Sequence, residues 1–269
     1  MRPITFLTDY GLDDEFVGVC HAVIARIAPG VQVIDLAHGL PRHDVRTAAL
    51  VLAGALPYAP AGVHLAVVDP GVGSGRRAVA VRTVKEGSIL VGPDNGLLKL
   101  AIKRLGGANE AVDLAESAER LLPVSPTFYG RDVFAPVAAR LARGAHLAAV
   151  GFPIDPHTLT ELELPTPRIE ADRVIAHALL RDRFGNLTLD LTPGEVGDGP
   201  IFIDSKVEVR VGERTASALF GRAFADVGEG ELLLYEDSTR RLALAVNLGS
   251  AAELLGLEPD GELEIRAAR

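Results

Sequence analysis

The stretch with the most chemical potential is VVDPGVGSGRR at residues 67–77. Asp69 follows an apolar run directly, three glycines come next, and the stretch closes on Arg76 and Arg77. A carboxylate at the end of a buried strand needs a partner, because burying an unpaired charge is costly. Glycines allow a backbone to approach a ligand or another segment closely. The stretch therefore predicts a site that combines a carboxylate with a guanidinium group.

Two further loops with acidic residues follow apolar segments. TDYGLDDEF occupies residues 8–16, and AHGLPRHD occupies residues 37–44. In an open parallel sheet, ligands bind beyond the carboxyl ends of the strands. We expect these two loops and the one that begins at Asp69 to converge on a single site.

Each of these residues also has a purely structural interpretation. Asp13 and Asp14 can cap and polarise a helix, and His43 can simply stand at a helix start. The glycines can form a tight crossover turn, and one of the two arginines can be a surface charge. Asp69 is the hardest to explain in this way, because a buried carboxylate requires a partner.

Several familiar site types do not match the sequence. No Walker lysine follows the glycines, no GxGxxG opens a helix after the first strand, and the acidic spacing fits no EF-hand loop. The G-x-S-x-G turn of a nucleophilic serine is absent. The residues instead favour a cationic or sugar-bearing ligand, and they predict no metal site.

The elements that must position these loops alternate between strands and helices. The apolar segments predict strands at 3–8, 31–36, 63–68, 77–83 and 88–92. Helical spacing predicts helices at 13–27, 43–56, 96–105 and 130–142, the last kinked or started by Pro136. This alternation, with continuously apolar strands, predicts an α/β domain over residues 1–155 with a mainly parallel sheet that is covered on both faces.

The pattern changes beyond residue 150. Residues 151–167 contain four prolines and no period, so they are interpreted as a linker. Short alternating segments follow, which predict an all-β domain at 168–269, either a sandwich or a barrel. These segments are VIAHALL, NLTLDL, KVEVRV, ELLLY, RLALAV and ELEIR.

Composition narrows the function class. A net charge of −9 over 269 residues argues against a nucleic-acid binder and favours a small-molecule partner. One cysteine allows no intramolecular disulfide. There is no signal-peptide pattern and no apolar run of about eighteen residues, so we expect a cytoplasmic protein without a membrane partner.

Five motifs, taken in order, resemble the S-adenosyl-L-methionine (SAM) hydroxide adenosyltransferases, or SAM hydrolases, which are relatives of the fluorinases and chlorinases. The motifs are TFLTDYGLDDEFVG, VVDPGVGSGRR, GPDNGLL, SPTFYGRDVFAP and DRFGN. The resemblance implies an N-terminal α/β domain and a C-terminal β-barrel. It also implies a homotrimer, with SAM bound between the N-terminal domain of one subunit and the C-terminal domain of the next.

The implied reaction is displacement at the ribose C5′ of SAM, with methionine as the leaving group and SAM as a substrate rather than a cofactor. By resemblance, Asp9 grips the ribose hydroxyls, Asp14 or Asp182 the methionine ammonium and Ser238 the methionine carboxylate. Asn186 and the backbone near Asn247 and Leu248 face adenine, and His43 falls beside the ribose.

The resemblance also implies a catalytic triad near the nucleophile. Asp69 and Arg76 match its first two members, and Tyr129 stands where the hydrolases have histidine, since TFYGRD replaces TFHGRD. We expect Arg76 to lower the pKa of Asp69 and keep it ionised.

Water as the nucleophile gives adenosine, which is the predicted activity. Two alternatives remain. One is a chlorinase-like halogenase, because Tyr129–Gly130 resembles the chlorinase pattern, and the other is a non-catalytic SAM or adenosine binder. The halogenases lack the aspartate at position 69, which would repel a halide, and the extra fluorinase loop near residues 77–92 is absent here.

Overall fold

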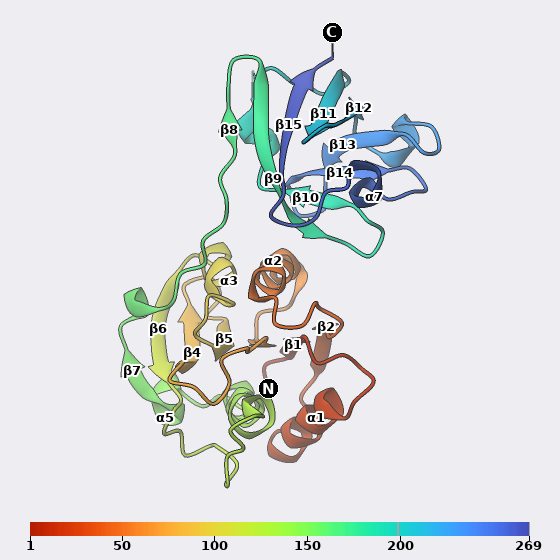
Figure 1. Cartoon of the computed structure of the whole chain (residues 1–269). Coiled ribbons are helices and arrows are strands. Elements are labelled where there is room, and N and C mark those ends of the chain that lie inside the picture. Colours follow the sequence, from red (N-terminus) through yellow and green to blue (C-terminus); the bar gives the residue numbers. More distant parts are fainter. Residues whose placement is uncertain (198, 269) are drawn as a thin grey trace. The chain divides into compact units, whose positions relative to one another are not determined.

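The computed structural model describes residues 1–197 and 199–268. The chain divides into two compact units, Met1–Leu162 and Glu163–Arg269 (Figure 1). Each unit has its own hydrophobic core. Within the described part of the chain, no helix has the length and apolar character needed to cross a membrane.

The first unit is built on a seven-stranded sheet in the order β2-β1-β3-β5-β4-β6-β7. Strands β2, β1, β3 and β5 are parallel, and β4, β6 and β7 extend the sheet in antiparallel pairings. The predicted mixed α/β fold with parallel strands at the site is confirmed. The strands are β1 (Ile4–Thr8), β2 (Val33–Ala37), β3 (Val63–Val67), β4 (Ala78–Thr83), β5 (Ile89–Pro93), β6 (Ala108–Asp113) and β7 (Phe152–Ile154).

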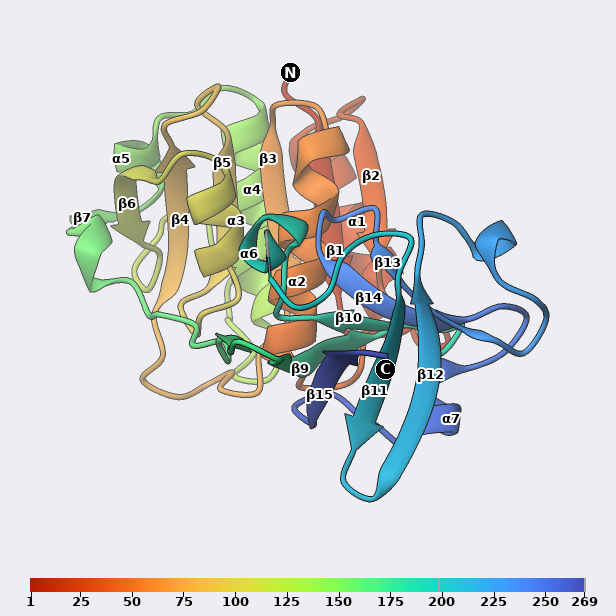
Figure 2. The ribbon, with the colours of Figure 1, turned by 90° about the horizontal axis from the view of Figure 1, so that it is seen from above.

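Helices cover both faces of this sheet (Figures 1 and 2). Alternate residues of β1 enter opposite cores: Phe6 packs with α1 and α4, whereas Leu7 packs with α2 and α3. The helices are α1 (Phe16–Ile27), α2 (Val45–Ala55), α3 (Lys99–Arg104), α4 (Ala135–Ala142) and α5 (Leu147–Val150), with short 3-10 turns at η1 (Leu56–Tyr58) and η3 (Pro156–Thr158).

The predicted helix at 130–142 is interrupted in the way that Pro136 suggested. Its first turn, η2 (Gly130–Phe134), is π-helical, and α4 begins directly after it with the proline in its first turn. Proline fits there because the first helical amides have no intrahelical acceptor. A π-helical turn is rare and often accompanies a functional site.

The second unit is a closed barrel of seven strands. The sheet runs β10-β14-β13-β12-β11-β15-β9-β8, and an additional pairing of β10 with β9 closes it. A β-barrel is thus confirmed over a sandwich. The strands are β8 (Arg168–Ile169), β9 (Arg173–Arg181), β10 (Leu187–Leu189), β11 (Lys206–Val211), β12 (Arg214–Phe220), β13 (Leu232–Glu236), β14 (Leu242–Val246) and β15 (Glu262–Ala267); α6 (Pro193–Val196), η4 (Phe224–Asp226) and α7 (Ala251–Leu255) are short helical turns.

Part of the proline-containing segment that the sequence analysis treats as a linker is folded into the first unit. Strand β7 pairs with β6. Beyond it, Thr160 N–H donates to Asp94 at 2.8 Å, and Arg77 Nη1 donates to Thr158 at 3.0 Å. These contacts attach the segment to the sheet next to the GPDNGLL motif.

Candidate active site

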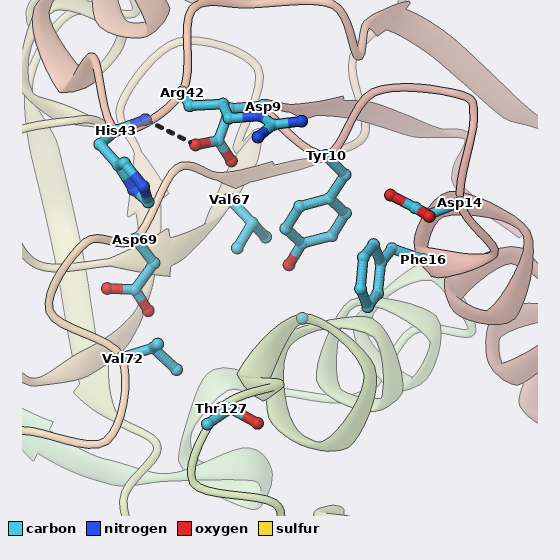
Figure 3. Close-up of a pocket in the computed structure, with 11 residues that line it drawn as sticks. Asp9, Tyr10, Asp14, Phe16, Arg42, His43, Val67, Asp69, Val72 and Thr127 are labelled. Atoms are coloured by element: carbon cyan, nitrogen blue, oxygen red, sulfur yellow. Dashed lines mark hydrogen bonds between the residues drawn. The ribbon is translucent and has the colours of Figure 1, made fainter.

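The predicted convergence of three loops occurs at the carboxyl ends of β1, β2 and β3. Asp9 follows β1, Arg42 and His43 follow β2, and Asp69 follows β3, and all four line one pocket (Figure 3). Residues 127 and 130, from the segment leading into η2, complete its wall. The pocket has a volume of about 300 Å³.

Asp69 and Arg76 form the buried ion pair expected from their types. Arg76 Nη2 donates to Asp69 Oδ2 at 2.5 Å, and the two side chains are only 9% and 6% exposed. The guanidinium carbon of Arg76 lies 5.6 Å from the ring centre of Tyr129 and 5.7 Å from that of Phe134. Aromatic faces attract a cation, so both rings hold Arg76 in place.

The two oxygens of Asp69 have different surroundings. Oδ2 accepts the hydrogen bond from Arg76, whereas Oδ1 is buried and has no close hydrogen-bond donor among the described residues. Asp69 lines the pocket, so its carboxylate belongs to the wall of the space in which a ligand would lie. A carboxylate held by arginine at such a wall can orient a bound water.

The pKa of Asp69 reflects opposing influences. Burial raises it, the charge and hydrogen bond of Arg76 and a hydrogen bond from the Gly71 amide lower it, and the nearby Asp9 carboxylate raises it further. Arg76 thus lowers the pKa as expected, but burial prevails and the net pKa is raised. Removing a carboxylate from water disfavours its charged form. Asp69 is therefore a stronger base than an exposed aspartate.

Asp9 and His43 are joined through the backbone. The His43 N–H donates to Asp9 Oδ2 at 2.8 Å, and His43 has a φ of 66°, which is uncommon for a residue other than glycine. The next residue, Asp44, caps α2 by accepting a hydrogen bond from the Thr47 N–H at 2.9 Å. The hydrogen bond from the His43 N–H fixes the orientation of the Asp9 carboxylate in the pocket (Figure 3).

An aromatic cluster forms another wall of the pocket. Phe128 lies 5.8 Å from Tyr10 and 5.1 Å from Phe16, measured between ring centres. The Tyr10 hydroxyl lies against Gly130, where a side-chain carbon would collide with it. Burial raises the pKa of Tyr10 well above its usual value, so the phenol stays neutral and can donate a hydrogen bond.

Sequence reasoning missed seven pocket residues: Tyr10, Phe16, Arg42, Val67, Val72, Thr127 and Gly130. All seven belong to motifs or loops that it had singled out, and this membership was the available signal. Asp14, by contrast, was proposed and does line the pocket. It does not cap α1, which begins at Phe16 and has no side-chain cap.

The glycine-rich loop packs against protein rather than only against a ligand. Gly73 has a φ of 77°, and a side-chain carbon there would lie 2.5 Å from the carbonyl oxygen of Pro126. At Gly75 a side-chain carbon would meet nothing within 4 Å. Gly73 thus allows the Asp69 loop to meet the segment that carries Thr127 and Tyr129.

Residues of the GPDNGLL motif hold both ends of the same loop. Asn95 Nδ2 donates to the carbonyl of Val68 at 2.9 Å, immediately before Asp69. Asp94 pairs with Arg77 at 2.6 Å, so Arg77 is structural rather than a free surface charge. The neighbouring arginines therefore have separate partners, Asp69 for Arg76 and Asp94 for Arg77.

The remaining predicted binding residues belong to the second unit. Asp182 accepts hydrogen bonds from the Asn186 N–H at 2.9 Å and the Asn186 side-chain amide at 2.8 Å. Gly185, in this same turn, packs against Ser250, which caps α7. The turn therefore lies beside the segment that contains Asn247 and Leu248.

Ser238 lies in the loop between β13 and β14. Next to it, the Asp237 carboxylate accepts a hydrogen bond from the Thr188 hydroxyl of β10 at 2.9 Å, which attaches the Ser238 loop to the strand that follows the Asp182 turn. The Asn247 side chain donates to the Val227 carbonyl at 2.9 Å, and Leu248 is 82% exposed with a φ of 58°. Ser238 precedes β14 whereas Asn247 and Leu248 follow it, so the predicted residues of the second unit are distributed along β10 and β14.

Comparison with known proteins matches both units to domains of one family. Residues 4–151 match the N-terminal domain of the SAM hydroxide adenosyltransferase family, and residues 176–264 match its C-terminal domain. An (R)-S-adenosyl-L-methionine hydrolase from Salinispora tropica is 48% identical over 264 residues, which cover 98% of this chain and 97% of that protein. A fluorinase from Nocardia brasiliensis is 28% identical over 294 residues, covering 98% of this chain and 97% of the fluorinase.

A crystal structure of a protein from Thermotoga maritima has 38% sequence identity and a TM-score of 0.90, covering 98% of this chain and 99% of that one. The ordered motifs, the two folds and these matches lead to one conclusion. The chain belongs to the SAM hydroxide adenosyltransferase family.

Proposed function

We propose that this protein hydrolyses SAM to adenosine and L-methionine. The observation that carries the proposal is the buried Asp69–Arg76 pair, whose aspartate lines the pocket. The hydrolase name of the Salinispora tropica relative, at 48% identity over nearly the whole chain, supports the same activity.

In the proposed reaction, Asp69 Oδ1 accepts a hydrogen bond from a water molecule and aims its oxygen at the ribose C5′. The new bond joins the water oxygen to C5′, and the C5′–S bond breaks with its electron pair moving to sulfur. The sulfonium becomes a neutral thioether, so methionine leaves without a general acid. The water proton passes to Asp69 and then to solvent. The raised pKa of Asp69 assists this step, because base strength and pKa rise together.

The other pocket residues hold the substrate in this proposal. Asp9, fixed by the His43 amide, accepts hydrogen bonds from the ribose hydroxyls, with the His43 side chain beside the sugar. Asp14 offers a carboxylate for the methionine ammonium, a role that Asp182 of the barrel can share. Asn186 and the backbone at Asn247 and Leu248 face adenine, and Ser238 holds the methionine carboxylate.

Tyr129 has a positioning role in this scheme. Its ring lies on the Arg76 guanidinium and it is not among the residues that line the pocket. It holds the arginine that in turn fixes Asp69. A halogenase is disfavoured by the Asp69 carboxylate, since a halide bound beside it would be repelled.

We further propose that the enzyme acts in the cytoplasm as a homotrimer and needs no cofactor, SAM being its substrate. Both the Asp69 pocket and the Asp182 turn of the barrel contain groups suited to SAM, which supports a site that takes groups from both units. The one cysteine, Cys20, is buried and unpaired, which suits a reducing compartment.

Product analysis tests the proposal. The protein is incubated with SAM in ¹⁸O-labelled water containing EDTA, with and without chloride, and the nucleosides are identified by mass spectrometry. We expect ¹⁸O-adenosine under both conditions. Formation of 5′-chloro-5′-deoxyadenosine would indicate the halogenase, tight SAM binding without turnover would indicate a binding protein, and loss of activity with EDTA would refute the absence of a cofactor.

A further inference from the structure

A second group of side chains with metal-ligating atoms lies outside the pocket. His21 comes from α1, Asp35 from β2, and His38 from the position that follows β2. Their three ligand atoms all lie within 4.8 Å of one another. None of the three residues lines the pocket, so the proposed hydrolysis does not account for them.

His38 presents an unsatisfied nitrogen to this group. Its side chain is only 4% exposed, and Nδ1 lies 2.8 Å from the hydroxyl oxygen of Thr8. Nε2 is buried and lies 3.1 Å from Asp35 Oδ1, but its geometry there does not meet that of a hydrogen bond. In the tautomer with its proton on Nδ1, His38 donates to the Thr8 hydroxyl oxygen and keeps a lone pair on Nε2. Metal-binding histidines show this arrangement, with one nitrogen on the ion and the other hydrogen-bonded.

The spacing of the three ligand atoms suits a small divalent ion. Asp35 Oδ1 lies 2.9 Å from His21 Nε2 and 3.1 Å from His38 Nε2. Ligands at the usual zinc distance of about 2.0 Å in a tetrahedron lie about 3.3 Å apart. Both distances to Asp35 are within a few tenths of an ångström of this spacing, and the two imidazole ligand atoms lie within 4.8 Å of each other. The His21 and Asp35 side chains are 33% and 46% exposed, which leaves access for water.

We propose that His21, Asp35 and His38 bind a divalent transition-metal ion such as Zn²⁺, with water as the fourth ligand. Two imidazoles and a carboxylate form a ligand set that zinc commonly takes. The ion is structural, since it lies apart from the groups assigned to hydrolysis.

Such an ion would support the loop that carries Asp9 and Tyr10. The His38 carbonyl accepts a hydrogen bond from the Gly11 N–H at 2.7 Å, and the Thr8 hydroxyl oxygen accepts one from the Tyr10 N–H at 3.2 Å. Fixing His38 to α1 through a metal would therefore hold both ends of this loop. The expected consequence is greater thermal stability rather than a change in the chemical step.

Calorimetric titration of the chelator-treated full-length protein with zinc chloride alone tests the site. We expect one ion per chain, and at least tenfold weaker binding in His21→Ala and in Asp35→Asn, since even groups behind the ligands change metal affinity by about 10–100-fold. His157→Ala is the matched control, because His157 is an exposed histidine outside the group, and its zinc affinity should equal that of the unmodified protein. Zinc should raise the melting temperature of the unmodified protein and the control, but not of His21→Ala.

Cobalt(II) provides a readout independent of activity, since its visible spectrum reports coordination by protein ligands. Circular dichroism checks that His21→Ala is folded, and Asp35→Asn provides a second variant of nearly unchanged volume. No zinc binding by the folded unmodified protein, or zinc affinities of both variants equal to that of the unmodified protein, would overturn the proposal and leave a His–Asp–His group without a metal. SAM hydrolysis assayed in parallel should persist in His21→Ala, so failure of the metal site is distinguishable from failure of the proposed function.

Discussion

At the scale of single residues, the chemistry of the pocket depends on two opposing influences on Asp69. Burial favours the protonated acid, whereas Arg76 favours the carboxylate. Because burial prevails, the pKa of Asp69 is raised and Asp69 is a stronger base than a solvated aspartate, while Arg76 limits the rise. Tyr129 contributes by holding Arg76 rather than by meeting the substrate.

Replacing Asp69 by asparagine tests the role of its charge. Asp69→Asn keeps the shape of the side chain but removes the base, so kcat should fall roughly a hundredfold or more, with KM for SAM nearly unchanged. Asp9→Asn is the contrasting variant, and it should mainly raise KM because Asp9 is proposed to hold the ribose. Steady-state kinetics on both variants provides the measurement. Full hydrolysis by Asp69→Asn would remove Asp69 from the mechanism.

The pH dependence of activity reports the influence of Arg76. Asp69 must be ionised to accept a proton, so kcat/KM falls as pH drops through its pKa, which is raised above the usual value. In Arg76→Gln the lowering influence is lost, and the acidic limb should move to higher pH by about 1–3 units. Activity should therefore begin to fall at a higher pH than in the unmodified protein and recover on the alkaline side.

Arg77→Gln is the matched control for this shift. Arg77 is the adjacent arginine but pairs with Asp94, so its loss should leave the acidic limb where it is. Profiles of kcat/KM against pH for the two variants decide the matter, and an unshifted limb in Arg76→Gln would contradict the coupling between Arg76 and Asp69.

At the scale of elements, the sequence predicts a strand correctly where its local pattern agrees with its burial in the fold. The fully buried strands β1 and β3 are continuous apolar runs and were predicted within a residue or two. Strand β12 was missed because RTASALF lacks a clear alternation, and its register comes from the neighbours β11 and β13. Strand β7 was missed because its proline suggests a linker, although an edge position tolerates proline.

The same limit applies to the site. Residue types identified Asp69 and Arg76, because a buried carboxylate requires a partner, but the balance between burial and charge at Asp69 needs the packed structure. The packing of Gly73 against Pro126 joins segments more than fifty positions apart, and no local pattern reports such a contact.

Gly73 and Gly75 form a matched pair for testing how the loop is held. Gly73→Ala places a side chain at a φ of 77° and 2.5 Å from the Pro126 carbonyl oxygen, which requires the loop to shift. The left-handed conformation alone costs about 1–2 kcal/mol for a residue with a side chain. We expect a lower melting temperature and reduced turnover in Gly73→Ala, whereas Gly75→Ala, which meets open space, should behave like the unmodified protein. Equal behaviour of the two variants, measured by thermal melting and hydrolysis, would argue against this packing.

At the scale of the whole molecule, the groups suited to SAM are divided between the two units. The Asp69 pocket belongs to Met1–Leu162, and the turn with Asp182 and Asn186 belongs to Glu163–Arg269. In the proposed homotrimer, each site takes its first unit from one subunit and its second unit from the next. Light scattering should give about three times the chain mass of 28.4 kDa.

Mixing two defective variants tests whether subunits share the sites. Asp69→Asn damages the first unit, and Asn186→Ala removes the amide proposed to face adenine in the second. If a site combines units from different subunits, trimers assembled from equal amounts of both should contain about a quarter of sites with neither change. If each site lies within one chain, every site carries one change and no activity returns. The proteins are unfolded together, refolded and assayed against the separately refolded variants; recovery near a quarter of the unmodified rate supports shared sites, and a rate equal to the mean of the two variants excludes them.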